Sequence, residues 1–162
     1  MGQGHRATIR WTREEGAVFT DGRYSRAHEW SFDGGVVVPG SPSPGVVPLP
    51  YSREDAVDPE EAFVAAAASC HMLTFLHLAS KRRLVVDAYA DEATGFMTKN
   101  EAGRLFVSRI VLDPRITFSG ERRPDEAAIA DLHHLAHREC FIANSVLTRI
   151  VVAGLQDHGG AA

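Results

Sequence analysis

The fold is decided by the stretch DPEEAFVAAAASCHMLTFLHLASK, residues 58–81. Asp58 is a good helix N-cap, Pro59 suits the first helical position, and two glutamates follow in the first turn. Apolar residues then recur at helical spacing as far as Lys81. The helix is apolar around most of its circumference, and the alanines at 65–68 would let another helix approach closely. We therefore expect a long helix that is buried on several sides.

The other expected elements surround this helix in an alternating order. They are strands at 6–12 and 24–32, a Pro/Gly-rich segment at 36–57, strands at 84–97 and 105–118 with a hairpin connection at 99–103, a helix at 124–139, a strand at 146–155 and a flexible tail at 156–162. Strands, a long helix, a hairpin, a helix and a strand predict a single α+β domain over 1–162 with a mainly antiparallel sheet.

The segment 36–57 is distinguished by five prolines between positions 39 and 50, together with Gly40 and Gly45. Proline has no backbone N–H to give to a sheet and disrupts a helix interior, so this segment predicts neither a central strand nor a helix. We expect an extended surface loop. Because a loop of this length is often functional, we expect it to cover the site on the following helix.

Composition limits the classes of function. The chain has 162 residues, 44% hydrophobic and 23% charged, with a formal charge of −4. Its basic residues are scattered, which argues against nucleic-acid binding. We expect no membrane partner, because no stretch approaches the ~20 apolar residues needed to span a bilayer, and the N-terminus does not look like a secretory signal. These features predict a cytoplasmic protein, whose two cysteines would form a transient rather than a permanent disulfide.

Cys70 is the first candidate for chemistry. A thiol in an apolar helix has a raised pKa and stays inert unless a positive group stabilises its thiolate. Arg26 and Arg23 are the upstream candidates, and Glu60 could hold either guanidinium. Glu60 and Cys70 lie about 15 Å apart along a straight helix, so they cannot touch within one element. Either the helix begins later than Pro59, or the arginine bridges elements, or a second chain contributes. Alternatively, Glu60 only complements the helix dipole.

Cys140 lies at the end of the second expected helix, where it is either a resolving thiol for Cys70 or an ordinary buried residue. His133, His134 and His137 precede it. Without Cys-x-x-Cys or His-Glu-x-x-His spacing they do not predict a metal site, and positive charge at a helix C-terminus accounts for them. A cysteine hydrolase is possible in principle, but no nucleophile signature supports it.

Two motifs together carry a family resemblance. DPEExFxAAxASC at 58–70 and ECFIANSV at 139–146 resemble the OsmC/Ohr family of thiol-dependent peroxidases, and the element order agrees over about residues 5–154. The resemblance implies that Cys70 is the peroxidatic thiolate and Cys140 the resolving cysteine. It also implies that an arginine, Arg26 before Arg23, stabilises the thiolate while Glu60 orients the guanidinium.

The resemblance further implies an OsmC-like fold in an intertwined homodimer whose long helices meet at its centre. The substrate would be an organic hydroperoxide, with hydrogen peroxide as an alternative, an external dithiol would be the reductant, and no cofactor would be bound. Apolar residues near the first cysteine, Phe63, Met72 and Phe75, would favour organic peroxides. Two alternatives remain: a non-enzymatic protein that binds a small apolar ligand or senses peroxide, and a partner-binding protein whose cysteines only pack.

Overall fold

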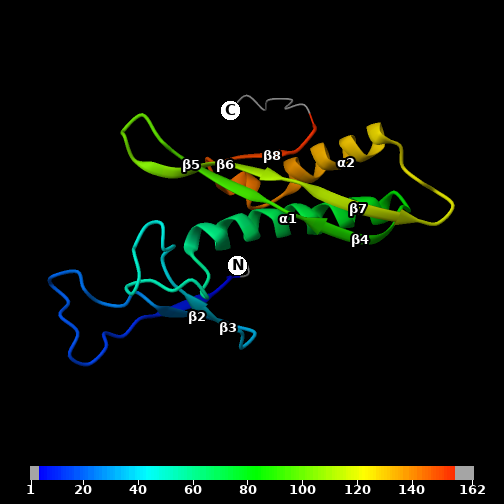
Figure 1. Ribbon diagram of the computed structural model, residues 1–162. Helices are drawn as coiled ribbons and strands as arrows, with labels where there is room; N and C mark the ends of the chain where they lie inside the picture. Colours follow the sequence, from blue (N-terminus) through cyan, green and yellow to red (C-terminus); the bar gives the residue numbers. More distant parts are fainter. Residues whose placement is uncertain (1–3, 156–162) are drawn as a thin grey trace. The chain divides into compact units, whose positions relative to one another are not determined.

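The computed structural model describes residues 4–155 and contains eight strands, two α-helices and one short 3-10 helix in these residues (Figure 1). The chain divides into two compact units, residues 1–62 and 63–162. The expectation of one domain over 1–162 stays a prediction. The tail expected at 156–162 lies outside the described residues.

The first unit is built on a three-stranded antiparallel sheet. Its strands are β1 (Ala7–Arg10), β2 (His28–Phe32) and β3 (Val37–Gly40), with β2 in the middle. The prediction of an extended loop is wrong at its start, because β3 lies within it. Pro39 is tolerated there because β3 is an edge strand. Residues 41–58 that follow are turns and irregular structure, apart from Val57, which forms an isolated parallel bridge with Gly40.

The long helix α1 (Pro59–Lys81) confirms the expected helix. Its start is a capping box: the Asp58 carboxylate accepts the Glu61 N–H at 2.7 Å, and the Glu61 carboxylate accepts the Asp58 N–H at 3.1 Å. Just beyond its end, Arg83 adopts a left-handed backbone conformation with φ 58°, a common way to terminate a helix. The start signals in the sequence therefore act as predicted.

The expectation that no stretch is long and apolar enough to span a bilayer is wrong for α1, which meets both criteria. The helix has 23 residues, and an 18-residue window in it reaches a mean hydropathy of 1.6, although only 22% of that window is buried. Its charges are confined to the first and last turns, with histidines between them. The core helix of a soluble protein passes the same test, so the finding is weak evidence for a membrane.

The second unit holds two small sheets. β4 (Val85–Asp91) pairs with β7 (Pro114–Ser119), whereas β5 (Thr94–Lys99) pairs with β6 (Leu105–Leu112). β8 (Arg149–Val152) runs parallel to β6. All other pairings between the strands of residues 4–155 are antiparallel, so the mainly antiparallel plan is confirmed.

Each of the two long strands expected in this unit is in fact two strands in different sheets. The break falls between β4 and β5 on one side and between β6 and β7 on the other. At this corner the Asp91 carboxylate accepts the Asp113 N–H at 2.8 Å. The alternation of apolar residues continues through the corner, which explains why the sequence pattern did not locate it.

Helix α2 (Glu126–Glu139) packs against the C-terminal half of α1. The Asp125 carboxylate caps it by accepting the Ala128 N–H at 2.8 Å. Two buried clusters result, one from α1, β6 and β8 and the other from α1 and α2 with side chains of β4 and β7. The fully buried members of the second are Phe75, Ala79, Leu132 and Ala136. The two helices are thus held by side-chain packing along one shared face.

Candidate functional site

The two cysteines meet in the second unit. Cys70 lies in the middle of α1, and Cys140 is the C-cap residue of α2. Both are free thiols, and the Cys140 thiol donates a hydrogen bond to the Cys70 sulfur over 2.8 Å. Cys140 is 1% exposed, whereas Cys70 is half-buried. A small oxidant therefore has access to Cys70, and Cys140 lies behind it within reach for a disulfide.

The segment after Cys140 holds this residue in place. The chain leaves the helix at Cys140 with φ −70° and ψ 118°, and the Ala143 N–H donates to its sulfur at 3.4 Å. The Asn144 side-chain amide donates to the carbonyl oxygens of Arg138 at 2.7 Å and Cys140 at 2.9 Å. These bonds satisfy carbonyls that a helix end leaves free. The motif at 139–146 is therefore a cap that orients the second thiol.

The environment keeps Cys140 protonated. Burial, followed by its hydrogen bond with Cys70, raises the pKa of the Cys140 thiol to about 11. At neutral pH this thiol is a donor.

A pair of buried histidines lies next to the cysteines. His71 Nε2 and His133 Nδ1 are 2.9 Å apart, and the residues are only 1% and 4% exposed. Burial is the largest cause that lowers their pKa values, to about 3 for His71 and about 4 for His133. Both rings are therefore neutral at physiological pH. The expectation that positive charge at a helix C-terminus accounts for this group is wrong for His133.

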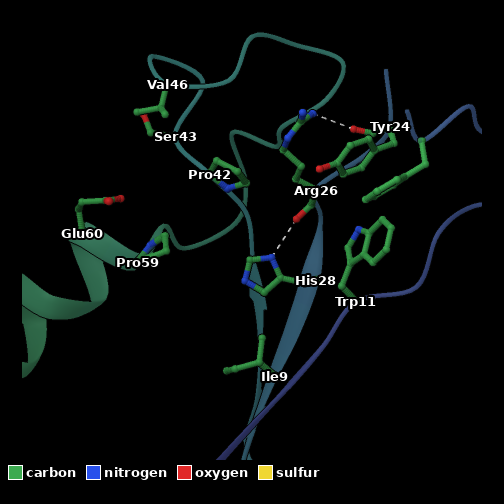
Figure 2. A pocket seen from close by; sticks show the side chains of 11 residues that line it. Ile9, Trp11, Tyr24, Arg26, His28, Pro42, Ser43, Val46, Pro59 and Glu60 are labelled. Carbon is green, nitrogen blue, oxygen red and sulfur yellow. Dashed lines mark hydrogen bonds between the residues drawn. The ribbon is translucent and has the colours of Figure 1, made fainter. Parts of the chain in front are cut away.

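The first unit contains an apolar cavity of about 480 Å³ that is lined by Arg26 and Glu60 (Figure 2). Three mutually packed aromatic rings form one wall, Trp11, Phe19 and Tyr24, and the centroids of the last two are 4.6 Å apart. Figure 2 shows Glu60 projecting from the first turn of α1 on the side opposite Trp11. The volume is that of a small-molecule site.

Arg26 is held by its own segment. Its guanidinium donates to the carbonyl oxygens of Tyr24 at 3.0 Å and Gly22 at 3.1 Å and lies 4.2 Å from the centroid of the Tyr24 ring. Arg23 instead forms an ion pair with Asp21 at 2.7 Å. In the described part of the chain, no ion pair joins Arg26 to Glu60. Their expected roles toward the Cys70 thiolate stay predictions.

Phe75 has a different role from the one expected. It was expected near the substrate, but it is fully buried and packs its ring against His133 at a centroid distance of 4.6 Å and against Tyr89 at 5.7 Å. The sequence patterns predict neither the histidine pair nor the aromatic wall. The seven-residue interval between His133 and Cys140, which is close to two helical turns, was the available signal for the pair.

The family model of the OsmC-like proteins matches residues 52–153. The chain belongs to this family. The match includes both cysteines and Glu60 and begins after Arg26. The comparison with curated proteins finds no match.

Solved structures of OsmC-like proteins resemble the whole fold. An OsmC-like protein of unknown function from Vibrio cholerae is 50% identical, with a TM-score of 0.91, over 93% of this chain and 98% of that one. An organic hydroperoxide resistance protein from Elizabethkingia anophelis is 17% identical, with a TM-score of 0.65, over 96% and 99%. The corresponding protein OhrB of Bacillus subtilis is 18% identical, with a TM-score of 0.59, over 93% and 95%. The last two likenesses establish the fold alone.

Proposed function

We propose that this OsmC-like protein is a thiol-dependent peroxidase that reduces organic hydroperoxides. The observation that carries the proposal is the 2.8 Å contact between the Cys140 and Cys70 sulfurs. A half-buried thiol in contact with a buried, protonated one has the arrangement that a peroxidatic and a resolving cysteine need. Family membership supports the same chemistry, since two structural relatives carry organic hydroperoxide resistance in their names.

The proposed cycle has three steps. The Cys70 thiolate attacks one oxygen of the hydroperoxide, the O–O bond breaks, and the other oxygen leaves and takes up a proton as an alcohol, so that Cys70 becomes a sulfenic acid. The Cys140 sulfur then attacks the Cys70 sulfur. The sulfenic hydroxyl leaves as water with the proton of the Cys140 thiol, and a disulfide forms. An external dithiol reduces this disulfide and restores both thiols.

Arg26 and Glu60 are assigned supporting roles in this proposal. A guanidinium at the Cys70 sulfur would favour the thiolate and stabilise charge on the leaving oxygen, and Glu60 would orient that guanidinium. Both residues line one cavity, which supports placing them in one site. The aromatic wall of that cavity suits the organic part of a hydroperoxide.

We also propose a homodimer, because α1 is apolar but poorly covered. Ala65, Ser69, Leu73 and His77 recur every four residues and are all exposed, Leu73 by 61%. Such spacing places them on one face of the helix. Residues that are small at one end of this face would let the same helix of a second copy approach closely. A Leu73→Glu variant is then expected to sediment as a monomer in analytical ultracentrifugation.

The peroxidase proposal is tested by following consumption of cumene hydroperoxide with dithiothreitol as reductant. The parent protein should turn over and Cys70→Ser should not. A Cys70→Ser variant as active as the parent would contradict the proposal.

The second candidate is a non-enzymatic protein that binds an apolar ligand. The aromatic-walled cavity of about 480 Å³ favours it, because such a cavity could hold a small molecule without any reaction. In that case cumyl alcohol would quench the fluorescence of Trp11 while the parent protein consumed no peroxide.

A further inference from the structure

We propose that His71 and His133 form a positioning pair that holds the Cys140 thiol against Cys70. The pair touches no reacting atom and acts through the relative placement of the two helices. The catalytic use of this placement rests on the proposed function. The placement itself can be measured from the disulfide alone.

The geometry is that of two separate contacts between the same two helices. His71 directly follows Cys70 on α1, and His133 precedes Cys140 by seven residues on α2. Seven residues make nearly two turns, so His133 and Cys140 lie on one face of α2 and about 10 Å apart along it. One contact joins the sulfurs over 2.8 Å and the other joins the ring nitrogens over 2.9 Å. Two contacts at this separation restrict rotation of α2 about either one.

The histidine contact adds a buried, directional bond to packing that is mostly apolar. The other directional contacts are the sulfur–sulfur bond and an exposed bond from the Arg82 guanidinium to the Asp131 carboxylate at 2.6 Å. The neighbouring interface consists of Phe75, Ala79, Leu132 and Ala136. Apolar burial of this kind is non-directional, whereas a hydrogen bond requires its atoms at a set distance and angle. The two rings are nearly parallel, with an interplanar angle of 10°. The bond therefore resists small shifts of α2 along or around α1, which non-directional packing alone would resist less.

The pair is costly as a packing element. His71 Nδ1 is buried and has no hydrogen-bond partner among residues 4–155, and such a group is unfavourable in a core. Two apolar side chains of similar size would fill the same space without that penalty. Buried polar contacts are best attested as devices that fix the register of packed helices. Fixing the register here fixes the distance between the two thiols.

The test is the equilibrium of the Cys70–Cys140 disulfide with glutathione at pH 7. Oxidised glutathione and the two thiols give the protein disulfide and two reduced glutathiones, and acid quenching followed by alkylation measures the ratio. His71→Gln retains a polar atom near the Nε2 position and His71→Asn does not reach it. We expect His71→Asn to lower the equilibrium constant about tenfold, the effect of one hydrogen bond, and His71→Gln to stay within about threefold of the parent.

A tenfold change corresponds to a reduction potential about 30 mV less negative. The control is His5→Asn, since His5 is an exposed histidine to which no role is assigned, and its potential should equal that of the parent. Urea unfolding of each reduced variant measures stability separately. A loss of stability in His71→Asn with an unchanged potential would overturn the proposal, and so would an equal shift in His5→Asn.

If His71→Asn does not fold, the reciprocal variants at His133 give the same test. There Asn places a polar atom near the Nδ1 position and Gln does not, so His133→Gln should shift the potential and His133→Asn should not. None of these measurements uses peroxide. If the potential shifts in the variants but the parent protein consumes no hydroperoxide, the positioning pair is supported and the proposed function is refuted. If the parent protein turns over hydroperoxide but the potential of the variants does not shift, the proposed function is supported and the positioning pair is refuted.

Discussion

The Cys140 thiol donates to the Cys70 sulfur over 2.8 Å, from the end of one helix to the middle of another. The donor is 1% exposed and its pKa is raised to about 11, so the second thiol is a weak target for oxidants and a ready partner for an oxidised Cys70. We therefore expect Cys70 to react with the oxidant and Cys140 to react with the oxidised Cys70.

Cys140→Ser tests that assignment. The serine hydroxyl cannot form a disulfide, so the Cys70 sulfenic acid should persist after one reaction with peroxide. We expect steady-state turnover to fall roughly 100-fold while the first turnover is retained. Mass spectrometry after treatment with dimedone should find one adduct on Cys70 in this variant and almost none in the parent. An adduct of equal yield in both proteins would contradict a resolving role for Cys140.

The buried histidines predict a loss of stability in mild acid. In the folded protein, burial together with nearby histidines holds the pKa of His71 at about 3, and burial and His134 hold that of His133 at about 4, both below the ordinary value of 6.5. At pH values near and below 6.5 the unfolded chain therefore binds more protons than the folded protein, so the free energy of unfolding decreases as the pH is lowered. Between pH 7.5 and 5.5 the two should contribute a loss of roughly 3 kcal/mol.

Urea unfolding across this range measures the effect. A double variant, His71→Leu with His133→Leu, should lose this part of the pH dependence, and His5→Leu, which changes an exposed histidine, should keep it. Parallel pH profiles for the parent and the double variant would show that the pair is not the source.

The sequence predicts some elements well because their signals are local. The sequence predicts the helix at 58–81 to within one residue, since Asp58 and Pro59 mark its start by their own chemistry. The strands at 84–97 and 105–118 were found, but their division between two sheets was not. A two-residue alternation identifies the buried side of a strand and carries no information on its partner.

In the site, too, local motifs identify individual residues, whereas the contacts between them depend on tertiary packing. Cys70 and Cys140 were singled out from their motifs, but the contact between them depends on how α2 packs on α1. His133 resembled its polar neighbours His134 and His137 in the sequence, and only the tertiary packing distinguishes it as buried. Arg26 and Glu60 were chosen as a pair and line the same cavity, although the arginine donates to backbone carbonyls.

A side chain in place of Gly40, at the end of β3, is expected to destabilise the protein. A Cβ atom there would lie 2.5 Å from His28 Nε2 and 2.8 Å from Trp30 Nε1, distances that force the rings to move. Gly40→Ala should lower the free energy of unfolding by about 1–3 kcal/mol, the usual cost of overpacking. Gly45→Ala is the control, since its Cβ would meet only Ser43 Oγ at 3.6 Å. Equal urea midpoints for the two variants would contradict the clash.

Phe19 should contribute to substrate binding if the cavity of the first unit receives the organic part of a hydroperoxide. Its ring stacks on Tyr24 and lines the cavity, so Phe19→Ala removes apolar surface that a cumyl group would contact. We expect KM for cumene hydroperoxide to rise about tenfold with kcat nearly unchanged, because the lost contact is the same in the ground and transition states. Hydrogen peroxide has no organic part, and its kcat/KM should not change.

Phe32→Ala is the matched control, because Phe32 is an exposed ring of the same unit that does not line the cavity. An equal loss with both peroxides in Phe19→Ala would assign the aromatic wall to folding and not to substrate selection.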